Sequence, residues 1–150
     1  MKDALGSYFN LTLLFVFILI VSGFISLAIN YTKAYRVKNN VLTYLEKYEG
    51  NANNQELLDK VQSYIKSVGY TFNQESISKA QQMGYTCPEY KGGKEGWCYK
   101  SNRASTKYGS TFNVDIVVFV NLHIPVINRI FSSLDFFWMR GTTSSIPVLE

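Results

Sequence analysis

The sequence is poor in the side chains from which catalytic and metal sites are built. Its 150 residues include one histidine, His123, and two cysteines, Cys87 and Cys98. A structural zinc site takes about four nitrogen or sulfur ligands, so these three residues are too few. His123 lies in an alternating, strand-like segment and is interpreted as a strand surface residue. The sequence shows no phosphate-binding glycine loop and no paired carboxylates. We therefore expect no enzyme activity, no cofactor and no small-molecule substrate.

The charged residues do not suggest a nucleic-acid interface. Fifteen basic against eleven acidic residues give a formal net charge of +4 at pH 7. The basic residues are spread along the chain, and the single close group is Lys33, Arg36 and Lys38. Because nucleic-acid interfaces concentrate lysine and arginine on one face, we expect no nucleic-acid partner.

Charge is absent altogether from residues 4–32, and residues 11–29 form an apolar run without proline. About 20 apolar residues in a helix cross the roughly 30 Å core of a bilayer. Residues 1–32 are therefore predicted to be a single transmembrane anchor. A cleaved signal peptide is the alternative. Its apolar region is usually about 7–15 residues long, and the nearest cleavage-site candidate here is Ser26-Leu27-Ala28.

The helical pattern continues beyond the apolar run. Apolar residues recur mostly every three or four positions as far as Tyr48, and Gly50 is the first break signal. This spacing predicts one helix over about residues 8–49. Its first half would lie in lipid, and its second half carries an apolar stripe. Residues 33–150 are predicted to form one domain that packs on this stripe.

Two shorter helices are predicted after the break. The first covers about residues 54–68, with Asn53 or Asn54 as its N-cap and Gly69 as its stop signal. A weaker helical pattern covers residues 73–83.

Strand signals follow the helices. Strict alternation over residues 108–124 predicts a half-buried strand with one fully apolar face. Pro125 ends this strand and suits the first position of a short helix, while residues 101–106 are mostly polar and are predicted to form a turn. The shorter predicted strands are 97–100 and 136–143. Because helices come first and strands later, the predicted fold is α+β, with an antiparallel sheet of about three strands over about 97–143, backed by the long helix.

The two cysteines bracket a short loop rich in glycine and proline, CPEYKGGKEGWC. A disulfide between Cys87 and Cys98 would close it and would stabilise the fold by roughly 3 kcal/mol; two free thiols are the alternative. Disulfides persist outside the cytosol, so the pairing predicts an extracytoplasmic domain. The three cations that follow the anchor favour a cytoplasmic domain instead. Tyr90 and Trp97 in the loop could contact a partner or simply pack the loop.

This arrangement of a half-apolar helix, a small sheet and a late disulfide loop resembles type IV pilins and pseudopilins. It is most similar to the minor TadE-like proteins of the tight adherence (Tad) systems of Gram-positive bacteria. The resemblance rests on the architecture and on two short segments, Ile124-Pro125-Val126-Ile127 and the final Gly-x-Thr strand at 138–143. It implies a pilin-like fold and a single-pass protein of the cell membrane that assembles with other pilin-like subunits and an assembly platform.

The sequence departs from that family in two ways. Pilins carry a glutamate early in the membrane helix, and this helix has no acidic residue. A short leader could end at Gly6, but Ser7 stands where an aromatic residue is usual. A minor subunit is therefore expected rather than the main repeating one. Small and polar residues let membrane helices approach closely, and the candidate contact positions are Asn10, Thr12, Ser22, Gly23 and Ser26. The alternative function is a stand-alone, membrane-anchored extracytoplasmic binding module.

Overall fold

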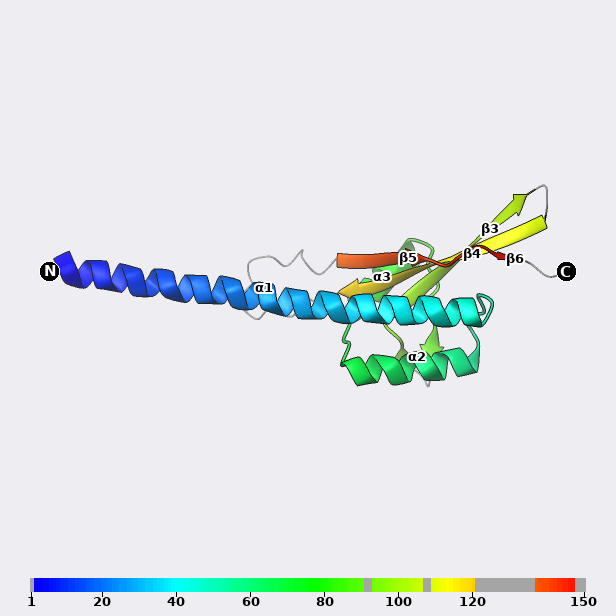
Figure 1. Ribbon diagram of the computed structural model, residues 1–150, viewed down its shortest axis with the longest axis horizontal. Coiled ribbons are helices and arrows are strands. Elements are labelled where there is room, and N and C mark those ends of the chain that lie inside the picture. Colours follow the sequence, from blue (N-terminus) through cyan, green and yellow to red (C-terminus); the bar gives the residue numbers. More distant parts are fainter. Residues whose placement is uncertain (1, 91–92, 107–108, 121–136, 148–150) are drawn as a thin grey trace.

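The computed structural model describes residues 2–90, 93–106, 109–120 and 137–147. A single long helix, α1 (Lys2–Lys47), extends from the other described helices and strands, which gather around the C-terminal half of that helix (Figure 1). The fold is α+β, as predicted: a long apolar N-terminal helix and a small antiparallel sheet.

Helix α1 contains no proline, and three of its threonines donate hydrogen bonds to carbonyls of the preceding turn. At 1.5 Å per residue its length is about 70 Å. The helix ends at the predicted break. Gly50 has a φ of +74°, and its N–H donates to the Leu45 carbonyl at 2.7 Å. A Cβ on Gly50 would lie 2.4 Å from the Phe112 ring, so this turn requires glycine for its backbone conformation and for the close packing.

Two shorter helices follow. Helix α2 (Gln55–Val68) runs back alongside α1 (Figure 1). Its N-cap is Asn54, whose side chain accepts from two backbone N–H groups, and it ends at Gly69 in the left-handed conformation. The predicted cap and stop are thus confirmed. Helix α3 (Gln74–Gln82) occupies the weaker helical pattern and is capped by Asn73.

The main sheet is antiparallel throughout. Its strands are β3 (Trp97–Thr106), β4 (Gly109–Val120), β5 (Phe137–Thr142) and β6 (Ile146–Pro147). Strand β4 is central: it pairs with β3 on one side and with β5 and β6 on the other. A separate small hairpin, β1 (Glu89–Tyr90) and β2 (Gly93–Lys94), lies within the cysteine loop.

The core lies between α1, α2 and one face of the sheet. Helix α1 contributes a fully buried stripe at three- and four-residue spacing: Ala34, Val37, Val41 and Leu45. Strand β4 contributes alternate residues that are at most 4% exposed: Val114, Ile116, Val118 and Val120. This is the predicted apolar face of that strand, so the alternation is confirmed for the part that the structure describes. Residues 121–124 and the helix predicted after Pro125 lie outside the described residues.

The opposite face of β4 is more deeply covered than the sequence predicts. Val117 and Phe119 belong to that face and are at most 1% exposed. They are buried because α3 and the disulfide loop cover this end of the sheet, with Phe119 packed in a second cluster that contains Ile77 and Cys98. The prediction of a strand buried on one face is therefore wrong at this end of β4.

The prediction of a turn over residues 101–106 is also wrong. These residues continue β3, which pairs with β4 from Trp97↔Val118 to Thr106↔Gly109. The polar side chains of residues 101–103 are tolerated on this edge strand because they are exposed. Asn102 Nδ2 donates to the carboxylate of Asp115, and so does Thr142 Oγ1, at 2.7 Å.

Candidate functional site

The N-terminal half of α1 has no apolar partner among the described residues. Its large hydrophobic side chains from Tyr8 to Ile29 are 36–72% exposed. Such a continuous apolar surface is far larger than a soluble monomer normally exposes. One helix in the described part of the chain is long and apolar enough to cross a membrane, and it is this one.

The predicted close-contact positions lie on more than one side of α1. Gly23, Ser26, Asn30 and Ala34 follow one another at three- or four-residue spacing, so they lie on one side of α1. Ala34 is the member of this row that packs in the main core. Gly23 is buried, and Ser26 is half-buried, although their large neighbours are exposed. Gly23 therefore offers a notch on the sheet-facing side of the apolar half.

The other predicted positions are distributed differently. Thr12 lies three turns before Gly23 on the same side, whereas Asn10 and Ser22 point to other sides. The hydroxyls of Thr12 and Ser22 donate to backbone carbonyls four and three residues earlier, at 3.0 and 2.9 Å. Both hydroxyls are therefore satisfied within their own helix.

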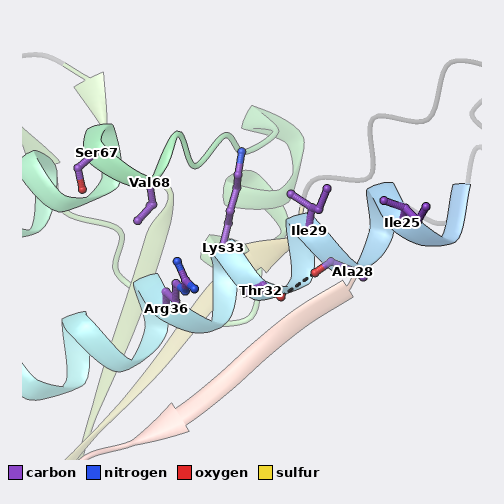
Figure 2. A pocket seen from close by; sticks show the side chains of 8 residues that line it. All are labelled: Ile25, Ala28, Ile29, Thr32, Lys33, Arg36, Ser67 and Val68. Atoms are coloured by element: carbon purple, nitrogen blue, oxygen red, sulfur yellow. Dashed lines mark hydrogen bonds between the residues drawn. The ribbon is translucent and has the colours of Figure 1, made fainter. Parts of the chain in front are cut away.

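A groove opens where the apolar half of α1 passes the end of α2 (Figure 2). Its volume is about 580 Å³. It is lined by Ile25, Ala28, Ile29, Thr32, Lys33, Arg36, Ser67 and Val68. The side of the groove toward the N-terminus of α1 is thus apolar, while the opposite side carries two cations and no lining residue is acidic.

The two cations of the groove are held differently. Lys33 Nζ donates a hydrogen bond at 3.1 Å to the carbonyl of Gly69, the C-cap residue of α2. An ammonium has three N–H donors, and two remain for other partners. Arg36 is exposed and has no hydrogen-bond or ion-pair partner among the described residues. The groove therefore presents N–H donors that have no acceptor among the described residues, beside an apolar wall.

The disulfide loop forms the second feature. The sulfur atoms of Cys87 and Cys98 lie 2.01 Å apart, at disulfide distance, which fits the predicted pairing. Both cysteines are buried, and Cys98 packs against Phe119 of β4. A reciprocal pair of backbone hydrogen bonds at 2.8 Å joins Thr86 to Tyr99 and holds the start of the loop on β3.

The loop contains a buried acid that the sequence does not reveal. Glu95 is 1% exposed, and its Oε2 accepts a hydrogen bond from Trp97 Nε1 at 2.9 Å. Its Oε1 has no partner among the described residues. Burial, assisted by the negative charge of Asp59, raises the pKa of Glu95 to about 7, although the Trp97 hydrogen bond opposes the shift. No feature of local spacing distinguishes Glu95 from the exposed acids.

Tyr70 ties the loop to the sheet. Its hydroxyl lies 2.7 Å from the Phe119 carbonyl and 2.9 Å from the Gly96 carbonyl, and it accepts from the Phe119 N–H at 3.1 Å. Burial raises the pKa of Tyr70. Gly96 has a φ of +75°, and a Cβ there would lie 2.2 Å from the Phe72 ring. The backbone can therefore pack this closely against Phe72 only if residue 96 is glycine.

The suggested partner contact at Trp97 does not fit the structure. Trp97 is fully buried, and its indole packs in the main core. It has no surface to present to a partner, because the first residue of β3 faces α1 and α2 rather than solvent. The side chain of Tyr90 lies outside the described residues, so its role stays a prediction.

A second, smaller groove lies on the face of the sheet opposite α1. It holds about 380 Å³ and is lined by Lys79, Met83, Trp138 and Arg140. Its chemistry is aromatic and cationic. Among the residues that can be described, no three of histidine, cysteine, aspartate and glutamate come together to hold a metal ion; His123 lies outside them.

The groove, the apolar half of α1 and the buried loop are therefore the features from which a function has to be inferred. No protein-family model matches this chain, and no curated protein or solved structure matches it.

Proposed function

We propose that the chain is a structural subunit, a minor pilin-like or pseudopilin-like component of a cell-envelope filament or secretion machine, that assembles through its N-terminal helix. The observation that carries the proposal is α1, one uninterrupted helix with two different halves. Its first half exposes apolar side chains, and one apolar stripe of its second half is buried against α2 and an antiparallel sheet. A protein built this way can rest in a bilayer and later pack its apolar half against similar helices.

In this proposal the chain spans the cell membrane once, with the domain after the anchor outside the cytoplasm. The disulfide-distance cysteines support that side, because such bonds persist in oxidising compartments. The partners are other pilin-like subunits and an assembly platform, and the contacts run along the sheet-facing side of the apolar half, around Gly23.

Replacing Gly23 with leucine should reduce association with other helix-anchored subunits at least fivefold. The added side chain fills the notch at which a neighbouring helix would approach closely. Tagged full-length protein would be isolated from its native membranes, and bound single-span proteins with the same helix-plus-sheet layout would be quantified by mass spectrometry. Ala28→Leu is the matched control, because Ala28 lies on the groove side of the same helix. Equal losses for both variants, or no loss for Gly23→Leu, would contradict assembly through this side.

Thiol labelling on intact cells tests the side of the membrane. A membrane-impermeant maleimide should label Cys87 and Cys98 only after an impermeant reductant and a mild denaturant have been applied, because both sulfurs are buried in the bonded pair. Labelling that requires cell lysis but no reductant would place the domain in the cytoplasm and would remove the pilin-like proposal.

The second candidate is a stand-alone, membrane-anchored binding module outside the cytoplasm. The groove at Lys79, Met83, Trp138 and Arg140 favours it, because the guanidinium of Arg140 in this lining suits the negative group of an anionic ligand, while Lys79 also pairs with Glu75 at 3.8 Å. This candidate is favoured if the tagged wild-type protein stays in the membrane but no partner subunits are isolated with it.

A further inference from the structure

We propose that the groove between α1 and the end of α2 binds one anionic phospholipid. Arg36 and Lys33 would hold the headgroup phosphate, and an acyl chain would lie along Ile25 and Ile29. The inference rests on one part of the proposed function, namely that α1 is embedded in a bilayer.

The height of the groove on α1 suits a lipid headgroup. If residues 11–29 fill the bilayer core, Lys33 lies about 6 Å and Arg36 about 10 Å above its edge, at 1.5 Å per residue. The polar layer of a bilayer is about 5–8 Å deep on each side. Side chains on a helix lean toward its N-terminus, so the Arg36 side chain leans back toward the phosphates. The two cations therefore reach the headgroup layer, while the apolar wall reaches the acyl chains.

The charge of the surroundings favours an anion. No aspartate or glutamate occurs in α1 between Ala4 and Leu45, and none occurs in α2 after Asp59. Arg36 has no partner in the described structure, and Lys33 uses one donor on the Gly69 carbonyl. A guanidinium presents a planar fork of N–H donors that matches two phosphate oxygens. An anionic headgroup would thus satisfy donors that the protein leaves open.

The same charges argue against a second copy of the chain in this groove. A parallel neighbour at the same height would bring its own Lys33 and Arg36 and no acid to face them. Like charges at close range repel, most strongly where water is depleted. A lipid with a negative headgroup is the complementary occupant, and the groove volume of about 580 Å³ falls within the range of about 300–1,000 Å³ for small-molecule sites.

The test uses the full-length protein in non-ionic detergent micelles. Palmitoyl-oleoyl phosphatidylglycerol or the matching phosphatidylcholine is titrated in, and bound lipid is counted by native mass spectrometry. The wild type should retain one phosphatidylglycerol with at least fivefold preference. Arg36→Gln should weaken that binding about fivefold, the typical contribution of one basic residue beside anionic lipid. Arg103→Gln, at an exposed position on β3, is the matched control and should change nothing.

A further variant separates the lipid from other occupants. Ala28→Trp fills the apolar side of the groove and should weaken binding of both lipids, whereas glycerol 3-phosphate, which lacks acyl chains, should not compete. Equal binding of the two lipids by the wild type, or equal effects of Arg36→Gln and Arg103→Gln, overturns the proposal. So does a protein dimer that Ala28→Trp abolishes while lipid adducts persist.

The failure of this inference can be told from the failure of the proposed anchor. Membranes that contain the chain are washed with alkaline carbonate. Release of the chain shows that α1 is not integral, and both proposals then fall. Retention of the chain without a phosphatidylglycerol preference removes the lipid site alone.

Discussion

Replacing Glu95 with glutamine should stabilise the folded protein by about 3 kcal/mol at pH 8 and by less than about 1 kcal/mol at pH 5. The carboxyl is buried, and one of its oxygens has no partner among the described residues. Glutamine keeps an acceptor for the Trp97 indole and removes the buried charge. The variant therefore resembles the protonated wild type at every pH.

The direction follows from the two pKa values. The folded pKa of Glu95 is raised to about 7 from an ordinary 4.5. Below about pH 4.5 the carboxyl is protonated in both the folded and unfolded states, so its charge costs nothing. Between about pH 4.5 and 7 the folded state holds a proton that the unfolded state has lost, and stability falls as pH rises. Above pH 7 the full cost of the buried charge remains.

Unfolding in detergent micelles, followed by tryptophan fluorescence from pH 5 to 8, would measure the effect. Glu89→Gln is the matched control, because Glu89 lies in the same loop and is exposed. The comparison is made between variant and wild type at each pH, so that the titration of every other group contributes equally to both proteins. If the stabilities of Glu95→Gln and wild type stay parallel across the range, the buried charge has no such cost.

Loss of the covalent link between Cys87 and Cys98 should destabilise the domain by about 3 kcal/mol. The bond closes a short loop, since the cysteines are separated by 11 positions. Closing a loop of this size restricts the unfolded chain by about that free energy. For a domain of roughly 100 residues the midpoint of thermal unfolding should fall by 10 °C or more, on the order of 4–8 °C for each kcal/mol.

Two forms of the protein distinguish the contribution of the covalent bond to stability from the contribution of the buried sulfur atoms. Wild type is reduced in denaturant and refolded, which keeps both sulfurs in the core beside Phe119. The Cys87→Ala/Cys98→Ala double variant removes the sulfurs as well and should lose somewhat more stability, because buried volume is lost. Equal unfolding midpoints for oxidised and reduced wild type would show that the cross-link contributes nothing.

Much of the secondary structure could be predicted because its signals are local. Helix α2 begins at an asparagine whose side chain accepts from the N–H groups of Glu56 and Leu57, and it ends at a glycine with positive φ. Both signals depend on a few neighbouring residues. Strand β4 was predictable for the same reason: its alternating apolar residues need only period-two geometry to form one buried face.

The candidate sites were less predictable because they depend on distant parts of the chain. Glu95 is buried because the cysteine loop folds onto the sheet, and its pKa responds to Asp59, which lies on another element. Trp97 could be placed in the loop from the sequence, but only the packing of β3 beneath α1 and α2 buries it. The groove likewise exists only because α2 returns along α1 and ends beside Lys33.

The sequence by itself determined that a long apolar helix is joined to a small α+β domain, because hydropathy and periodicity act over neighbouring residues. The tertiary structure alone decided that both faces of β4 are covered near Phe119 and that residues 101–106 continue a strand. It also decided that Arg36, which has no partner among the described residues, lines a groove with an apolar wall. The physical reason is that burial, pairing across strands and electrostatic surroundings are set by contacts between segments far apart in the chain. The spacing of residues along the chain does not predict those contacts.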